Sequence, residues 1–167
     1  NGMEAEAQAA LDNAKKYNAN DPAIYLYEGD LLISKDKPGD AAGRYEQAIH
    51  FDPACKEAYI KYANVYQGVT PTLSIEMLQK VISNYPDYLP AYCHLGNIYS
   101  LQGNYPKAVA AYKTYMAGGL YSTDNLVHYA SALFFNKQYA ESGKIISEGQ
   151  AIDPDNFLLK RLAIYNE

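Results

Sequence analysis

The chain has 167 residues, of which 49% are hydrophobic and 20% are charged, so it can bury a core and is neither disordered nor collagen-like. Its 14 basic and 19 acidic residues give a net charge of −5, which disfavours nucleic acid as a partner because a phosphate backbone is repelled on average. No apolar run approaches the roughly 18 residues of a membrane-spanning helix, so we expect no membrane insertion.

The predicted elements are all helices, and the first covers residues 3–17 with its apolar side chains on one face. The chain after it is periodic. A small residue inside an apolar helical pattern recurs at spacings of 34, 33 and 34, at Gly29, Ala63, Gly96 and Ala130. A large residue stands four positions before and three positions after each of them, which places it on the same helical face.

A second set of small residues follows the first set along the chain. Its spacings are 33, 34 and 34, at Ala41, Ser74, Ala108 and Ser142. The short spacing falls in a different interval in the two sets, so one residue must be missing within residues 66–74. Gly68 and Pro71 mark a turn in that interval, and a deletion inside a turn leaves both helical faces in register.

Each repeat is therefore predicted to contain two helices, A and B, joined by a short turn. We expect the four turns at residues 35–38, 67–72, 102–104 and 136–138. The repeats span residues 22–55, 56–88, 89–122 and 123–156, between half repeats at residues 1–21 and 157–167. The prediction is one solenoid domain over residues 1–167, with about ten helices and mainly nearest-neighbour contacts.

The third repeat shows the pattern of large and small residues most completely, with Tyr92, Leu95, Gly96, Tyr99, Ala108 and Tyr112. This pattern resembles the tetratricopeptide repeat (TPR) family, over residues 22–155 as whole repeats and over most of the remainder as halves. The resemblance implies an all-α, right-handed solenoid of antiparallel helix pairs. Tyr115 stands where the family has a small residue, so we expect the third helix B to end early or the third and fourth repeats to move apart.

Catalysis is not expected, because the three histidines, two cysteines and scattered carboxylates form no nucleophile elbow, phosphate loop or paired metal motif. We therefore predict no enzyme activity, no cofactor and no metal site. His94 and His128 occupy the same helix A position in adjacent repeats, with Cys93 beside the first of them. A metal ion between them would lack a complete ligand set, and solvated histidines on a polar groove are the favoured interpretation.

The candidate binding residues lie on helix A, which lines the concave surface in the TPR family. An apolar row contains Leu26, Ile60, Cys93 and Val127, a polar row contains Asp30, Asn64, Asn97 and Ser131, and Lys61, His94 and His128 flank the apolar row. An amide side chain donates and accepts at once, so a row of Asn residues can hold an extended peptide in a groove. The alternative is that these are exposed polar residues without a function.

The resemblance also bears on one known kind of partner. TPR domains that clamp the acidic C-termini of heat-shock chaperones use Lys and Asn in helix A of one repeat, Asn in the next, and Lys and Arg in a third. The corresponding positions here are Leu26, Asp30, Lys61, Pro90 and His94. Because the cationic pair is missing, we expect no binding of an acidic chaperone C-terminus.

The favoured function is a non-enzymatic interaction module or scaffold that binds a peptide or helix of a protein partner in its groove. One alternative is a homo-oligomer or structural spacer assembled through residues 157–167. There Leu158, Leu159, Leu162 and Ile164 are expected to be partly uncovered. The other alternative is an accessory region of a larger enzyme or sensor.

Overall fold

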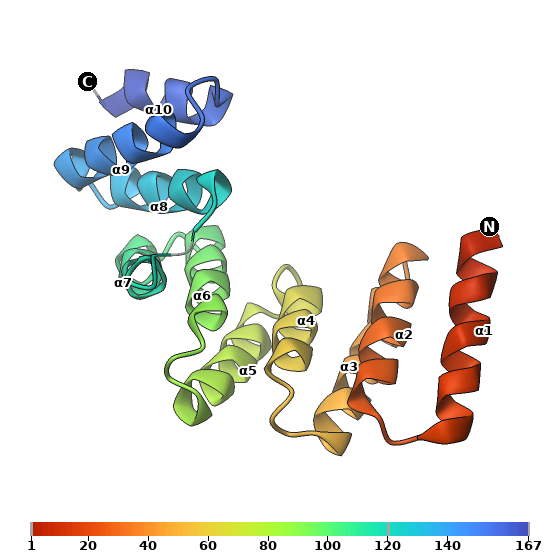
Figure 1. The fold of residues 1–167 in the computed structure, drawn as a ribbon. Helices are drawn as coiled ribbons and strands as arrows, with labels where there is room; N and C mark the ends of the chain where they lie inside the picture. The colour runs from red at the N-terminus through yellow and green to blue at the C-terminus, as the bar shows by residue number, and fades with distance from the viewer. Residues whose placement is uncertain (1, 120, 167) are drawn as a thin grey trace. The chain divides into compact units, whose positions relative to one another are not determined.

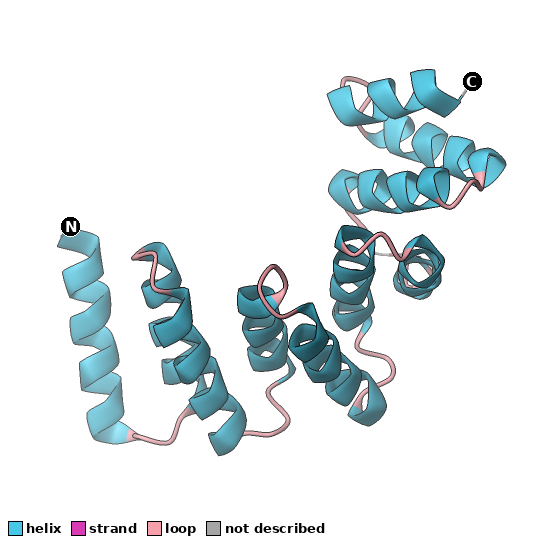
Figure 2. Ribbon diagram, turned by 180° about the vertical axis from the view of Figure 1, so that it is seen from behind, coloured by secondary structure: helices cyan, strands magenta, loops and turns pink. Residues whose placement is uncertain are grey.

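Ten α-helices make up the regular structure of residues 2–119 and 121–166, which the computed structural model describes (Figure 1). They are α1 (Gly2–Tyr17), α2 (Pro22–Ser34), α3 (Pro38–Phe51), α4 (Lys56–Tyr66), α5 (Pro71–Asn84), α6 (Leu89–Leu101), α7 (Tyr105–Met116), α8 (Thr123–Phe135), α9 (Tyr139–Ile152) and α10 (Phe157–Asn166). Between the helices the described chain forms only loops and turns (Figure 2). The all-α prediction is confirmed, and no described helix has the length and apolar character needed to cross a membrane.

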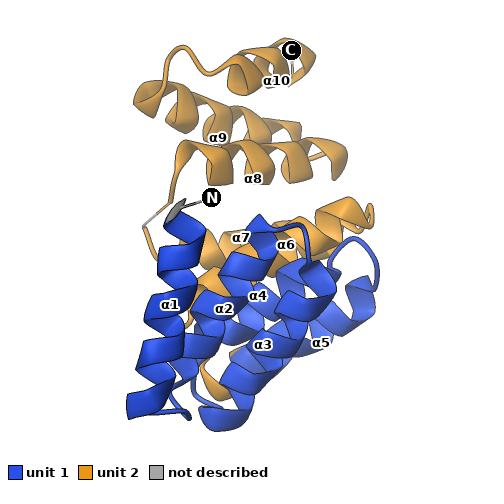
Figure 3. Cartoon of the chain, turned by 90° about the vertical axis from the view of Figure 1, so that its right-hand side faces the viewer, with its two compact units in different colours: residues 1–81 blue, residues 82–167 orange. Residues whose placement is uncertain are grey.

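The chain divides into two compact units, residues 1–81 and residues 82–167 (Figure 3). In the first unit α2 packs on α1 and α3, and α3 packs on α4. In the second unit α6 packs on α7, α7 on α8, α8 on α9, and α10 on both α8 and α9. The boundary lies inside α5, so the single domain expected over residues 1–167 stays a prediction.

The four A helices, α2, α4, α6 and α8, begin in register. Each begins seven residues before its small residue, from Pro22 in the first repeat to Thr123 in the fourth. In the fourth repeat Ser122 and Asn125 form a capping box, in which each side chain accepts a hydrogen bond from the other residue's backbone N–H. The sequence period therefore fixes where each helix A starts.

A tyrosine ring covers the glycine where the two helices of the first repeat cross, and again in the third. A Cβ atom added to Gly96 would lie 2.6 Å from a carbon of the Tyr112 ring, and one added to Gly29 would overlap Tyr45. Both rings are buried, with exposed fractions of 2% or less. Glycine is thus required at these two crossings because any side chain would occupy the space of the ring.

The second repeat is one residue shorter than the others, and the deletion was expected inside its turn. In the structure the shortened element is instead the helix α4. The helix α4 ends at Tyr66, three residues after Ala63, whereas α2, α6 and α8 each continue for five residues beyond the equivalent position. The loop at residues 67–70 is one residue longer than the loops at residues 35–37, 102–104 and 136–138. The deletion is real, but it shortens the last turn of the helix, and the loop grows in compensation.

The helix α7 ends early, as expected from Tyr115. It has 12 residues, whereas α3, α5 and α9 have 14 each. The Tyr115 hydroxyl donates a hydrogen bond of 2.9 Å to Asn125 Oδ1 on α8, so the ring fills space where the family has a small residue. Past the end of α7, Gly118 packs directly against Leu89, leaving no room for a side chain there.

Candidate functional site

The first unit contains a pocket of about 490 Å³ beside three of the predicted binding residues. Its lining comes from α2, α3 and α4 and consists of Asp30, Ile33, Pro38, Tyr45, Lys61, Asn64 and Val65. The wall is apolar at Ile33 and Val65 and polar at Asp30, Lys61 and Asn64. Such a mixture of apolar area and a few convergent polar groups is typical of a binding site.

The carboxylate of Asp30 is engaged by two neighbours in this pocket. Its Oδ1 accepts hydrogen bonds of 2.9 Å from the Tyr45 hydroxyl and from Lys61 Nζ, and its Oδ2 accepts one of 3.0 Å from Lys61 Nζ. Burial alone would lower the pKa of Lys61, but Asp30 and Glu57 outweigh burial and raise that pKa. The lysine is thus a cation that is already paired with two carboxylates.

The other predicted residues of the first unit differ in how much surface they offer. Asn64 is exposed, and its side chain makes no hydrogen bond with the described residues. Ile60 is only 7% exposed, and Leu26 is half-buried against the core of α2, α3 and α4. The structure therefore brings Asp30, Lys61 and Asn64 together, whereas the apolar row mainly packs the helices.

In the second unit the apolar row is also buried, with Cys93 8% and Val127 7% exposed. Burial raises the pKa of the Cys93 thiol, whose sulfur accepts a 3.3 Å contact from Asn125 Nδ2. In the polar row, Asn97 Oδ1 accepts a 2.7 Å hydrogen bond from the Tyr112 hydroxyl. Ser131 lies further along the same row, and its hydroxyl donates to the backbone of its own helix at Val127.

The two predicted histidines have different surroundings. His94 is half-buried, and this burial lowers its pKa, whereas His128 is exposed. No group of three or more potential metal ligands occurs among residues 2–119 and 121–166. The structure thus supplies no partner set for an ion at either histidine.

The second unit has its own pocket, of about 290 Å³, between α8 and α10. Its lining is Val127, Ser131, Phe134, Phe135, Leu158, Arg161, Leu162 and Tyr165. Sequence reasoning had placed the binding residues on four A helices and missed α10. The signal was present, because Arg161 and Tyr165 lie 34 residues after Val127 and Ser131 and so continue the apolar and polar rows.

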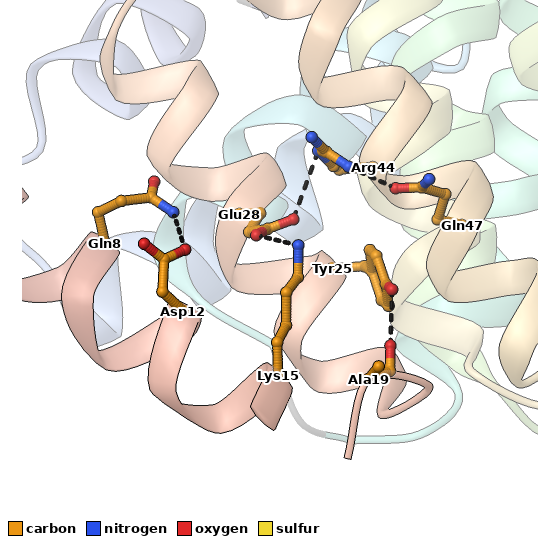
Figure 4. Close-up of polar contacts among 8 residues, drawn as sticks. All are labelled: Gln8, Asp12, Lys15, Ala19, Tyr25, Glu28, Arg44 and Gln47. Atoms are coloured by element: carbon orange, nitrogen blue, oxygen red, sulfur yellow. Dashed lines mark hydrogen bonds and ion pairs between the residues drawn. The ribbon is translucent and has the colours of Figure 1, made fainter. Parts of the chain in front are cut away.

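A buried ion-pair cluster in the first unit was also missed (Figure 4). Glu28 on α2 is 6% exposed and lies between Lys15 of α1, at 2.5 Å, and Arg44 of α3, at 3.4 Å. At the equivalent position the other repeats hold Tyr62, Leu95 and Tyr129, all buried. The sequence did contain a signal for this cluster, because Glu28 is a carboxylate at a position where the other repeats have a large, buried aromatic or aliphatic residue.

The comparisons with known proteins agree with this geometry. The family model of the tetratricopeptide repeat matches residues 77–110, which include all of α6. Residues 77–110 thus match a tetratricopeptide repeat. The predicted solenoid of antiparallel TPR helix pairs is confirmed.

Several solved structures share the fold at low sequence identity. YrrB, a TPR protein with an unusual peptide-binding site, has a TM-score of 0.77 and 18% identity over 94% of this chain and 81% of its own. PilW, a type IV pilus biogenesis factor, has a TM-score of 0.78 and 17% identity over 93% and 73%. A thermophilic TPR protein of Thermus thermophilus has a TM-score of 0.74 and 16% identity over 99% and 91%. No curated protein matches the sequence.

Proposed function

We propose that this TPR chain is a non-enzymatic protein-interaction module that binds a peptide or helix of a partner against its A helices. In the first unit the contact is the pocket formed by Asp30, Lys61 and Asn64 with the apolar residues Ile33 and Val65. YrrB, a TPR protein with an unusual peptide-binding site, has a similar fold and supports the same class of ligand. Within residues 2–119 and 121–166, no specific contact favours self-association through the C-terminal helix or an accessory role in a larger enzyme or sensor.

The proposal rests mainly on the Asn64 amide, which receives no hydrogen bond from helix B. In the first and third repeats a tyrosine hydroxyl from helix B donates to the equivalent side chain, Asp30 or Asn97. In the second repeat that tyrosine is replaced by Leu78, which has no donor. The amide of Asn64 thus keeps both its donor and its acceptor for a partner's backbone.

The charges around the pocket also favour a particular ligand. Lys61 lies between two carboxylates, Asp30 at 2.9 Å and Glu57 at 3.4 Å, so the three groups together carry one negative charge. A partner with an apolar side chain for Ile33 and Val65 and a basic group nearby would fit both features. Repulsion would disfavour an acidic partner at this pocket.

The test is a random peptide display against the whole chain, followed by fluorescence polarisation of the selected peptides. We expect Asn64→Ala to weaken the binding of the selected peptides at least fivefold, because it removes an amide that forms no hydrogen bond with the described residues. Asn84→Ala, which changes an exposed Asn at the end of α5, is the matched control and should have no effect. Equal binding by the wild type and Asn64→Ala would refute the proposed contact.

The single variant at Asn64 is more informative than a double variant that also changes Asn97. Asn97 accepts a hydrogen bond from the buried Tyr112, so its removal also perturbs the fold of the third repeat. Circular dichroism of Asn64→Ala should match the wild type, which separates a lost contact from lost structure.

A further inference from the structure

The pocket between α8 and α10 differs in charge from the pocket of the first unit. Arg161 is exposed at its wall and forms no ion pair with any residue that the structure describes. The neighbouring Lys160, by contrast, is paired with Asp155 at 2.9 Å. Arg161 instead lies with its guanidinium carbon 5.9 Å from the centre of the Phe157 ring. The positive charge is therefore available to a ligand.

The repeat register places this arginine on the ligand-facing side of helix A. The equivalent positions in the four repeats hold the apolar row that ends at Val127, which itself lines the pocket. A cation at this position is a departure from the row, and it occurs in α10 alone. Packing does not explain the change, because the arginine side chain is exposed.

Aromatic side chains form much of the remaining wall, and the two phenylalanines among them are held by neighbouring rings. The Phe135 ring stacks on Tyr105 with centroids 5.1 Å apart, and the Phe134 and Tyr139 rings form a T-shaped pair with centroids 5.4 Å apart. Even so, Phe135 is 56% exposed and Tyr165 is 65% exposed. Exposed, pre-ordered aromatic residues beside an arginine are the composition of energetically dominant spots in protein interfaces.

The exposed residues around α10 are not a uniform apolar face. Leu159 was expected to be partly uncovered, but it is fully buried and packs on Gly149. Leu158 is 42% exposed and belongs to the pocket lining. The apolar surface next to Arg161 is thus a bounded pocket of about 290 Å³, near the lower limit for small-ligand sites, which suits one side chain.

We propose that the pocket between α8 and α10 binds an aromatic or branched aliphatic side chain of a partner protein, while Arg161 pairs with an Asp or Glu carboxylate next to it in the partner's sequence. This inference rests on the proposed interaction function and adds a second contact with a different ligand preference. A guanidinium forms two parallel hydrogen bonds with a carboxylate, so the pair selects acidic side chains by geometry as well as charge.

The carboxylate is assigned to an internal side chain of the partner, not to its chain terminus. The polar row continues beside the pocket within the second unit, from Tyr165 to Ser131 and then to Asn97. A partner chain that extends past the pocket on both sides would use this surface as well as the surface beyond Arg161. A terminal residue would end at Arg161.

The test uses capped dipeptides and ¹⁵N-labelled full chain, with chemical shifts followed at Ser131, Phe134 and Leu162. The probes are N-acetyl-Phe-Glu-amide, its Gln counterpart and N-acetyl-Gly-Glu-amide. We expect the Glu probe to bind about threefold or more tightly than the Gln probe, in line with a partly exposed ion pair. This preference should shrink as sodium chloride is raised from about 50 to about 500 mM, because salt screens exposed charges.

The variant Arg161→Gln should abolish the preference for Glu over Gln, whereas Lys160→Gln, with the same charge change on the same helix, should retain it. Arg161→Lys should keep part of the preference and so guards against a folding defect in the Gln variant. Equal affinities of the Glu and Gln probes for the wild type, or no saturable shift at the three reporters, would overturn the inference. Tighter binding of N-acetyl-Gly-Phe with a free α-carboxylate would overturn the assignment to an internal residue.

The two proposals fail separately. Shifts confined to Asn64 and Val65 would show that the probes use the pocket of the first unit, which would remove only the inference about α8 and α10. An effect of Asn64→Ala on displayed peptides is likewise independent of Arg161. If the dipeptides bind as expected but Asn64→Ala changes nothing, the contact in the first unit is wrong and the one at Arg161 stands.

Discussion

The first and third repeats pack their helices differently from the second and fourth. In the first and third, a glycine on helix A lies under a tyrosine from helix B, as in Gly29 with Tyr45 and Gly96 with Tyr112. In both, the tyrosine hydroxyl continues across the crossing and donates to the polar row of helix A. The fit of ring and glycine thus also determines which polar groups are occupied.

The second and fourth repeats replace every part of this arrangement. Alanine takes the place of glycine, and the tyrosine becomes Leu78 or Ile146. The small residue of helix B becomes a serine, and the Ser74 and Ser142 hydroxyls donate to the carbonyls of Ala63 and Ala130 at 2.7 and 3.0 Å. Both serines are fully buried, so they link the two helices from inside.

The comparison shows that the residues at the helix crossing alternate with a period of two repeats, whereas the helix pair itself recurs in every repeat. The small residue of helix A and the large residue of helix B change together at the crossing. The reason is that an alanine Cβ fits beneath an aliphatic side chain but not beneath a tyrosine ring. The repeats without the tyrosine are those in which the polar row, at Asn64 and Ser131, receives no hydroxyl from helix B. Packing inside the pair therefore decides which polar groups remain for a partner.

The largest effect is expected for Gly96→Leu. Its Cβ would lie 2.6 Å from the buried Tyr112 ring, so the helices must separate, at a cost of about 3 kcal/mol in the free energy of unfolding. Urea unfolding followed by circular dichroism measures this cost. Gly43→Leu on α3 is the control, because a Cβ at Gly43 meets no atom within 4 Å. Equal stability of the two variants would mean that the glycine under the ring is not required.

Alkaline pH should destabilise the first and third repeats, in which a buried tyrosine covers the glycine of helix A. Burial raises the pKa of Tyr112 from 10.0 to about 12, so between these values the phenol ionises in the unfolded chain and stays protonated in the folded one. The stability that it contributes is complete below pH 10 and lost as pH rises to about 12, by about 2 kcal/mol. Unfolding measured across this range should show a shallower decline for Tyr112→Phe.

The control for that experiment is Tyr17→Phe, because Tyr17 is 86% exposed. It should follow the wild-type pH dependence throughout. Identical pH dependence of the wild type and Tyr112→Phe would show that this buried phenol does not set the alkaline limit.

The effect of Gly96→Ala on the free energy of unfolding should change sign when Tyr112 is replaced. With Tyr112 present, the added methyl overlaps the ring and costs about 1–2 kcal/mol. In a Tyr112→Ile background the pair copies the fourth repeat, and alanine should then stabilise by about 1 kcal/mol through its higher helix propensity. A double-mutant cycle of unfolding free energies measures the coupling. Additive effects would contradict the idea that the two positions change together.

The fold was predictable because its determinants are local. Spacings of small and large residues gave the repeats, the starts of the A helices and the early end of α7 at Tyr115. These features depend on which residues share a helical face and on the size of single side chains. The shortened end of α4 was not predicted, because a deletion can be absorbed by either the helix or the loop and the spacing is the same for both.

The candidate site was predictable only in part. The register correctly brought Asp30, Lys61 and Asn64 to one surface, but it could not show that Lys61 would pair with Asp30, 31 residues away. Pairing depends on side-chain geometry between helices, and the sequence pattern contains no distance. The buried Glu28 was missed for the same reason, since its partners come from two other helices.

Removing the buried serine hydroxyl should affect the second and fourth repeats moderately. Ser142→Ala loses the hydrogen bond to the Ala130 carbonyl, which should cost about 1 kcal/mol of unfolding free energy. Ser147→Ala on the same helix is the control, because its hydroxyl is exposed and bonds within α9. Chemical denaturation compares the two. A cost no larger for Ser142→Ala than for Ser147→Ala would remove the serine from the account of how these repeats are joined.

The smallest effect on stability is expected for substitutions in the turns between helices A and B. The turn of the second repeat differs in backbone conformation from the other three. Asp36 and Lys137 have positive φ values of 55° and 62°, and Gly103 has 70° at the equivalent position, two residues before helix B. The corresponding residue of the second repeat, Val69, is not in this region. Since a side chain is disfavoured at positive φ, Asp36→Gly and Lys137→Gly should each stabilise by about 0.5–1 kcal/mol. Thermal unfolding measures the gain. Val69→Gly should instead destabilise slightly, because glycine there adds only freedom to the unfolded chain. A gain at Val69 equal to that at Asp36 would show that the longer loop after α4 is strained in the same way.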